Sequence, residues 1–433
     1  MKNSAFTKLP ALCAALLLAA CGAPVSEQPA SSATAEDASP PQAVEPSAAP
    51  TQSPEMPQSA EQAGPLYWVD AQNSAGRYEA EWDYNTDTAV ARYLDFNTAT
   101  EQIVGEPLEL PYGNAYLFAD DEFLYWTWSG MVNDTPILLR SNLDGSGRVP
   151  LYEFRQGASL GMDTARGFAS DGRNLYFPYS QISDDPAVPD RFFLARLDTE
   201  TQTLEMILEW EPFVGNLFGV WNDCLLITHT VLDEDCPLEP VYGHYYIENM
   251  EELEPWQTTY LCALDPATGE EEVLYECPGT WLDRRVADGA LWRSDKDNRL
   301  LCKPLDQPEE FTVLQTSLPA YPYAIYTEDI LLSATDEAGK DLLYLYDRTT
   351  GSLTSSPRRR WMGGEDRAIS VLCEAGQGQY VVIDDASAGM QAVADADGNQ
   401  YLIDGYARYA IASRDALLDE SIPLTPITRP GAA

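Results

Sequence analysis

Short hydrophobic runs separated by acidic or glycine-rich turns recur along most of this chain. The runs are five to eight residues long and rich in Tyr, Trp, Val, Leu and Phe, which favours strands over helices. Seven of the turns contain an Asp that follows a hydrophobic residue: Asp95, Asp144, Asp198, Asp265, Asp306, Asp347 and Asp397. Their spacing of 41 to 67 residues is close to the period of about 40 to 50 residues that separates propeller blades. The pattern therefore predicts an all-β chain built from repeated four-stranded units.

The second repeat shows how strands are assigned within one unit. Its hydrophobic runs lie at residues 115–119, 123–128, 137–143 and 149–154, with turn residues between them. We name such strands A to D in chain order, and each is expected to pair antiparallel with the next. Residues 65–427 are predicted to form a single β-propeller with seven blades of four antiparallel strands, although the spacing also accommodates six or eight blades.

The two ends of this region predict how the ring closes. Residues 66–71 (LYWVDA) align with the B strands of later repeats, so the first blade lacks an A strand. Residues 409–413 (YAIAS) form one strand more than the last repeat needs. We expect this C-terminal strand to pair into the first blade and remove both open sheet edges. Alternatively, residues 78–84 form a strand and the first blade is self-sufficient.

The N-terminal residues have the pattern of an export signal. Lys2 and Lys8 precede or border an apolar stretch at residues 9–18, which is too short to span a bilayer. The following Leu18-Ala19-Ala20-Cys21 resembles the lipobox of bacterial lipoproteins. The resemblance implies that Cys21 is lipidated and anchors an extracytoplasmic protein to the bacterial cell membrane.

The composition changes abruptly between the signal and the propeller. Residues 22–64 consist largely of Ala, Ser, Pro, Gln and Glu and contain no Lys, Arg or aromatic residue. Such a segment buries too little apolar surface to offset the entropy of ordering, so we expect a disordered linker. The predicted organisation is a signal peptide at 1–20, the lipidated Cys and linker at 21–64, the propeller at 65–427 and a tail at 428–433.

Two turns carry a family resemblance. The segments LYLYDRTTG (343–351) and LCALDPATG (261–269) resemble the low-density-lipoprotein-receptor-type and TolB-like propeller repeats found in bacterial lipoproteins. The chain departs from the receptor type because its nearest match to the YWTD tetrapeptide is Tyr125-Trp126-Thr127-Trp128. The resemblance implies a propeller and a surface protein and leaves the function open.

The topology separates short turns from long connections. A-to-B and C-to-D turns share one face of the propeller, whereas B-to-C and D-to-A connections share the other, which we name the long-loop face. Its long connections are expected at residues 73–87, 181–191 and 229–258. The last of these contains His229 and many acidic residues, and its predicted ligand-binding residues are Tyr242, His244, Tyr245, Tyr246 and Trp256. Aromatic rings among carboxylates suit sugars or cationic ligands, although the same rings could pack the loop onto the propeller.

Other chemical signals are weak. Neither HExxH nor a paired CxxC occurs, residues 395–399 (DADGN) suit a turn better than a calcium loop, and the sequence predicts no metal and no cofactor. The string GASLG (157–161) lacks the helix that a nucleophile elbow requires. Six cysteines follow Cys21, and their redox state stays open, with Cys224–Cys236 and Cys262–Cys277 as local disulfide candidates beside Cys302 and Cys373.

Charge narrows the possible partners. The chain has 69 acidic and 26 basic residues and a formal net charge of −43, which repels nucleic acid and excludes it as a partner. The one basic run, Arg358 to Arg360 with Arg367, is either a solvated loop or a small anion site. We expect a membrane-anchored, non-catalytic propeller that binds a glycan, peptide or protein partner through its long-loop face. The alternative is an extracytoplasmic hydrolase or lyase that acts on polysaccharide.

Overall fold

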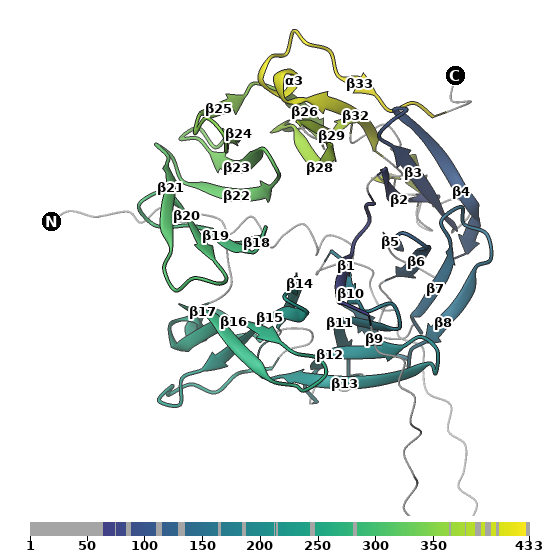
Figure 1. Ribbon diagram of the computed structural model, residues 1–433, viewed down its shortest axis with the longest axis vertical. Helices are drawn as coiled ribbons and strands as arrows, with labels where there is room; N and C mark the ends of the chain where they lie inside the picture. The colour runs from purple at the N-terminus through teal and green to yellow at the C-terminus, as the bar shows by residue number, and fades with distance from the viewer. Residues whose placement is uncertain are drawn as a thin grey trace, which may run out of the picture. The chain divides into compact units, whose positions relative to one another are not determined.

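Seven β-sheets follow one another around a ring in the computed structural model (Figure 1). The structure describes residues 64–429 apart from positions 74, 84–87, 110–114, 129–134, 163–165, 184–187, 212, 214, 243–246, 280–283, 363–364, 377, 386–390, 395–399, 404–406. All described residues belong to one compact unit, Ala60–Ala433. The prediction of an all-β propeller with seven blades is confirmed.

The blades follow the chain order, and their strands are antiparallel. The first blade contains β2 (Gly76–Asp83), β3 (Thr88–Asp95) and β4 (Thr100–Glu109). The second contains β5 (Ala115–Ala119), β6 (Phe123–Trp128), β7 (Ile137–Asn142) and β8 (Val149–Glu153). The third contains β10 (Phe168–Ser170), β11 (Asn174–Gln181), β12 (Arg191–Asp198) and β13 (Thr203–Trp210), joined by β1 (Tyr67–Val69) and β9 (Ala158–Leu160).

The remaining four blades keep the same order. The fourth contains β14 (Asn216–Trp221), β15 (Cys224–Leu232), β16 (Gln257–Leu264) and β17 (Glu271–Pro278). The fifth contains β18 (Arg284–Ala287), β19 (Ala290–Ser294), β20 (Arg299–Pro304) and β21 (Phe311–Gln315). The sixth contains β22 (Ala320–Ile325), β23 (Asp329–Thr335), β24 (Asp341–Asp347) and β25 (Leu353–Ser356). The seventh contains β28 (Ser370–Gly376), β29 (Gln379–Asp385), β32 (Arg408–Ser413) and β33 (Thr425–Pro426).

The other regular elements among the described residues are two hairpins and three short helices. Two hairpins extend the connections, β26 (Arg359–Met362) with β27 (Glu365–Ala368) and β30 (Gln391–Ala394) with β31 (Gln400–Ile403). The short helices are α2 (Met250–Leu253), η1 (Glu254–Trp256) and α3 (Arg414–Leu418). Among the described helices, none has the length and apolar character needed to cross a membrane.

The hydrophobic core is divided into layers between neighbouring blades. Each layer combines side chains from two successive sheets, and one layer occurs at each of the seven blade interfaces. Trp126, for example, is fully buried between the first and second blades. Strand alternation explains this arrangement, because both faces of every blade pack against a neighbour.

The recurring turn aspartates organise the C-to-D turns. Asp95, Asp198, Asp265 and Asp347 each accept hydrogen bonds from the backbone N–H groups two and three residues further on. Asp397 lies outside the described residues. A short carboxylate can satisfy turn donors in this way, which explains why the pattern was visible in the sequence.

The N-terminal strand corrects one sequence-based prediction. Residues 66–71 do not form the B strand of the first blade, because β1 pairs with β10 and adds an inner strand to the third blade. The first blade instead starts at β2, so the alternative of a self-sufficient first blade is the better description. For the same reason, residues 73–87 are not a long connection but contain β2.

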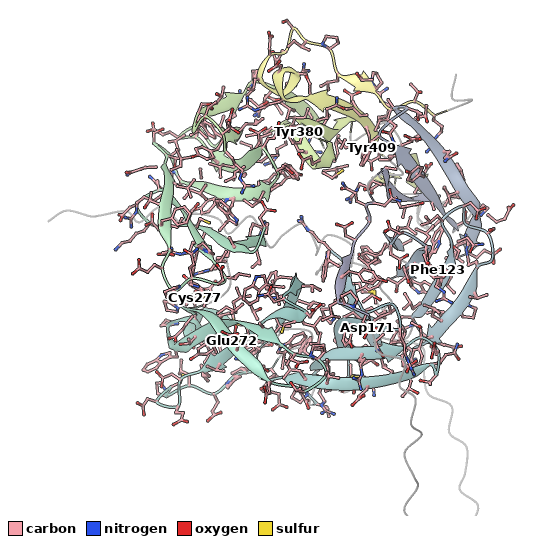
Figure 2. The ribbon with its side chains drawn as sticks, in the orientation of Figure 1. Phe123, Asp171, Glu272, Cys277, Tyr380 and Tyr409 are labelled. Carbon is pink, nitrogen blue, oxygen red and sulfur yellow. The ribbon has the colours of Figure 1, made fainter. Side chains whose placement is uncertain are left out.

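The C-terminal strand corrects a second prediction. Residues 409–413 do not pair into the first blade, because β32 pairs with β29 and belongs to the last blade (Figure 2 labels Tyr380 and Tyr409 on these two strands). The ring closes through side chains and one isolated parallel bridge between Thr100 and Thr428. The pattern had assigned the strand correctly but not its partner, since pairing depends on contacts between distant residues.

The cysteines of the propeller are free thiols. Cys262, Cys277, Cys302 and Cys373 are buried, whereas Cys224 and Cys236 are partly exposed. The structure therefore supports the reduced state that the sequence left open.

Candidate functional site

A cavity of about 960 Å³ lies along the inner edges of five blades. It is lined by the innermost strands of these blades, β2, β5, β18, β22 and β28, and by residues 70–73, which follow β1. In the third blade the inner edge of β10 is covered by β1. A cavity of this size can hold a ligand of several sugar units or a short peptide segment.

Three arginines line this cavity, and they come from distant parts of the chain. Arg285 is the second residue of the A strand β18, and Arg166 lies in the connection that enters the third blade. A strands run toward the A-to-B turns, so their first residues lie at the long-loop face. We name the opening of the cavity at this face the arginine mouth, defined by Arg166, Arg285 and Arg360. Arg77 lies at the other end of the cavity, because it is opposite Leu94, next to the C-to-D turn of Asp95.

Arg360 joins the mouth through the β26–β27 hairpin between the sixth and seventh blades. It interacts with Tyr323, a cavity-lining residue of β22 whose hydroxyl donates a hydrogen bond to the Val371 carbonyl at 2.8 Å. Burial raises the pKa of Tyr323, and the guanidinium groups of the mouth and of Arg77 act in the opposite direction. The charges of the mouth therefore act on one point inside the cavity.

The arginines differ in their partners. Arg77 Nε lies 2.5 Å from Glu79 Oε1; burial opposes its charge, yet Glu79 holds the pKa of Arg77 above its usual range. Arg285 donates a hydrogen bond to the Arg284 carbonyl at 3.0 Å. Burial lowers the pKa of Arg360, and its Nε has no hydrogen-bond partner among the described residues. A buried donor of this kind is stabilised when an anion accepts from it.

The opposite end of the cavity carries carboxylates. Glu374 is near the end of β28 and accepts hydrogen bonds from Thr327 N and Oγ1 at 3.3 and 3.1 Å. Asp70 accepts from Gln72 N at 2.7 Å, and burial raises the pKa of Asp70. The cavity thus changes from positive at the long-loop face to an end that carries Asp70, Glu374 and the Arg77–Glu79 ion pair. An anionic group would enter from the arginine mouth.

The A-to-B face has a second, acidic pocket of about 450 Å³ lined by Tyr67, Asp120, Asp121 and Glu122. Asp120 accepts from Phe123 N at 2.7 Å and from the Tyr125 hydroxyl at 2.9 Å. Asp171 makes the equivalent bond to Tyr176 at 3.1 Å in the next blade. Asp120 and Asp171 therefore stabilise the turns in which they lie. The presence of Asp120 at this pocket is explained by the turn structure and does not require a ligand.

The long B-to-C connection of the fourth blade is shorter than predicted. Strand β15 continues to Leu232 and β16 begins at Gln257, so His229 and Thr258 lie in strands and the loop comprises residues 233–256. Ile247 and Leu253 are buried beneath it against Phe213, with Leu238 and Met250 packed around them. The loop therefore has a small apolar core of its own.

The aromatic residues predicted to bind ligand are partly placed by the structure. Tyr242 is 44% exposed, and Trp256 is half-buried in η1. His244, Tyr245 and Tyr246 lie outside the described residues. Their role in binding stays a prediction, and the buried core of the loop shows that packing explains some of its hydrophobic residues.

Most arginines of the basic run, Arg358 to Arg360 with Arg367, make structural contacts. Arg358 donates to the carbonyls of Ala416, Asp419 and Ile422 at the C-terminal end of α3. Arg359 contacts Asp366 at 3.1 Å, and Arg367 pairs with Asp341 at 2.7 Å. Only Arg360 acts at the cavity. The sequence offered no signal for the mouth, because its three arginines belong to different parts of the chain and meet only when the ring forms.

Comparison with known proteins gives no family assignment. No protein-family model matches the chain, and no curated protein matches it. Among solved structures, the β-propeller domain of the Trilobed protease from Pyrococcus furiosus aligns with 11% identity and a TM-score of 0.43, over 82% of this chain and 96% of that one. An oligogalacturonate lyase from Vibrio parahaemolyticus aligns with 12% identity and a TM-score of 0.39, over 86% of this chain and 88% of that one.

A prolyl endopeptidase is also similar, with 13% identity and a TM-score of 0.43 over 81% of this chain. This chain covers 47% of that enzyme, so it spans about half of its length. The part of the sequence-based resemblance that the structure supports is the propeller fold. Similarities this low assign neither an activity nor a ligand.

Proposed function

We propose that this protein is a binding propeller that takes an acidic oligosaccharide at the arginine mouth of its long-loop face. The observation that carries the proposal is the convergence of Arg166, Arg285 and Arg360 at one end of the cavity. Guanidinium groups bind carboxylates through paired, charge-assisted hydrogen bonds. Tyr116, Tyr323 and Tyr326 line the same cavity and offer ring faces on which sugars can stack.

The overall charge makes this concentration of arginines meaningful. The chain has 26 basic residues against 69 acidic ones, so most of its surface repels anions. A positive mouth within a negative surface favours a single point of entry for an anionic ligand. The loop at residues 233–256 is on the same face, and Tyr242 and Trp256 are proposed as outer contacts for a longer chain.

The location proposed for this activity is the outer side of a bacterial cell membrane. Lipidation of Cys21 would hold the propeller there and leave the linker to set its distance from the surface. Cys21→Ser should move the protein from the membrane fraction to the soluble fraction and remove the acyl mass. Continued sedimentation of the variant with membranes would contradict the anchor.

The binding proposal is tested by isothermal titration with uronic-acid oligosaccharides, their neutral counterparts and acidic peptides. We expect the acidic oligosaccharides to bind at least tenfold more tightly than the neutral ones. Arg285→Gln and Arg360→Gln should each weaken binding about tenfold, which corresponds to about 1.4 kcal/mol. Tighter binding of the acidic peptides than of the acidic oligosaccharides would support the same binding site but show that its ligand is a peptide.

Arg191→Gln is the matched control for these variants. It removes the same charge from β12, outside the cavity lining, where Arg191 is 55% exposed and pairs with Glu209 at 2.7 Å. Binding should be unchanged in this variant. An equal loss of affinity in the control would show that only the net charge matters, and equal binding of neutral oligosaccharides would contradict the proposed role of the mouth.

The second candidate function is that of an enzyme that cleaves polysaccharide. One carboxyl group, that of Asp70, favours it. Asp70 lies in the same cavity, and its raised pKa brings the carboxyl closer to the range useful for proton transfer. Product analysis after each titration distinguishes the two functions. Cleavage that disappears in Asp70→Asn would favour the enzyme, and intact oligosaccharide would favour binding.

A further inference from the structure

A histidine, a cysteine and a glutamate meet on one face of the fourth blade. They are His229 of β15, Cys262 of β16 and Glu271 of β17, and we name them the blade-four trio. Their ligand atoms all lie within 4.8 Å of one another, and His229 Nδ1 is 3.4 Å from Glu271 Oε2. The trio is separate from the arginine mouth, which does not involve the fourth blade.

Strand register explains why these side chains share a face. Cys262 is opposite Ile227, which is two positions from His229 along β15. Glu271 is opposite Leu264, which is two positions from Cys262 along β16. Positions two apart in a strand point to the same side, so all three residues project from one surface of the sheet.

The trio is partly buried and partly exposed to solvent. Cys262 is fully buried in the layer between the third and fourth blades, whereas the side chains of His229 and Glu271 are 28% and 26% exposed. The ring of Tyr260 lies 5.5 Å from that of His229 and covers one side of it. A small ion could reach the trio past His229 and Glu271 while the sulfur stays protected.

The thiol is protonated in the protein without a metal ion. Burial, the nearby charge of Glu271 and a hydrogen bond to Glu271 raise the pKa of Cys262 to about 12. The trio is therefore stable as a hydrogen-bonded group. It also contains the nitrogen, sulfur and oxygen donors that Zn²⁺ accepts in proteins.

We propose that the blade-four trio binds one Zn²⁺ ion, with a water molecule as the fourth ligand. Binding replaces the thiol proton by the metal: the S–H bond of Cys262 breaks, the proton leaves to solvent and Glu271 changes from hydrogen-bond acceptor to ligand. Donors around a tetrahedral zinc are separated by roughly 3.3 to 3.8 Å, as bond lengths of about 2.0 to 2.3 Å require. His229 and Glu271 already have this separation, and rotation of the partly exposed Glu271 side chain can bring its oxygen to the ion.

The test is a Co²⁺ titration of the full chain in excess Ca²⁺ and Mg²⁺, which occupy ordinary carboxylate sites. We expect one equivalent of Co²⁺ to give a thiolate-to-metal absorption band and Zn²⁺ to remove it. Because one proton is released, the affinity should rise about tenfold per pH unit near neutrality. Absence of the band in the unmodified protein would overturn the proposal.

Variants show whether the band belongs to the trio. Cys262→Ser should abolish it, and His229→Gln and Glu271→Gln, at partly exposed positions, should weaken Co²⁺ binding at least tenfold. Cys277→Ser is the matched control, since Cys277 is also a buried thiol of this blade but is outside the trio (Figure 2). Survival of the band in Cys262→Ser, or unchanged affinity in both Gln variants, would show that the trio is only a hydrogen-bonded structural group.

Discussion

At the scale of single residues, Asp329 shows how a buried carboxylate is paired in this propeller. Asp329 is completely buried; it accepts a hydrogen bond from the Tyr380 hydroxyl at 2.5 Å and faces Arg414 Nε at 2.9 Å. Burial and this carboxylate raise the pKa of Tyr380 (Figure 2). An ionised carboxylate in such a place needs its cation, because the interior solvates it poorly.

The first prediction concerns this pair. Arg414→Gln should lower the free energy of unfolding by about 3 to 5 kcal/mol, because Asp329 would remain buried without its cation. Urea unfolding monitored by fluorescence measures the change. Arg408→Gln is the control, since Arg408 is 58% exposed, and it should change stability by less than about 1 kcal/mol. Equal effects of the two substitutions on stability would contradict the proposed role of Arg414 as the partner of buried Asp329.

The second prediction concerns pH. Burial alone would raise the pKa of Asp198, but hydrogen bonds from Arg173 and from the turn backbone lower it to about 2. Because the pKa is lowered in the folded state, Asp198 stabilises the fold at pH values above its unfolded pKa of about 3.9. This stabilisation is lost as the pH falls toward 2. Asp198→Asn should thus be less stable by about 1 kcal/mol at pH 7 and equal to the unmodified protein near pH 2. A difference that persists at pH 2 would require another cause.

Single residues also mark the limit of the sequence-based predictions. The turn aspartates were recognised because their hydrogen bonds are local, within three residues of each carboxylate. The arginine mouth and the blade-four trio were not recognised. Both depend on strand register and ring position, which bring together residues far apart in the chain.

At the scale of elements, hydrophobic alternation located strands better than it located their partners. Strands β5 and β6 have the predicted bounds, because their runs are flanked by clear turn residues. Strand β1 was also visible as a hydrophobic run but was placed in the wrong blade. Its three residues pair with β10, about one hundred positions later, and no local pattern encodes that choice.

The third prediction concerns the loop at residues 233–256. Replacing it by a short Gly/Ser turn should leave the propeller folded and shift the midpoint of thermal unfolding by only a few degrees, because loop length has a small entropic effect. Its buried residues contact mainly one another and Phe213. Circular dichroism and differential scanning calorimetry measure the outcome. Loss of cooperative unfolding would show that the loop is part of the propeller core.

At the scale of the whole molecule, the ring closes without a strand shared by the first and last blades. Leu94 and Phe96 of the first blade pack against Tyr409 and Ile411 of the last. Beside them, Arg92 is 1% exposed and lies 2.5 Å from Glu101, which also contacts Arg429 of the C-terminal segment at 2.6 Å. Packing and charge pairing therefore replace the strand exchange that the sequence predicted.

The fourth prediction tests this closure. Glu101→Ala should destabilise the protein by about 3 to 5 kcal/mol, because it removes the nearest carboxylate from a buried arginine. Glu106→Ala, an exposed position of the same strand, should have little effect. Hydrogen exchange should also accelerate in β3 and β32 of the Glu101 variant. Equal unfolding midpoints for the two variants would contradict the proposed closure.

The arginine mouth is the central claim at this scale, and anomalous diffraction from crystals soaked in bromide tests it most directly. Bromide reports anion sites without requiring that the natural ligand be known. The account predicts a bromide ion in the cavity, in contact with at least two of Arg166, Arg285 and Arg360. Bromide bound only at outer arginines such as Arg191 and Arg196, with none in the cavity, would contradict it.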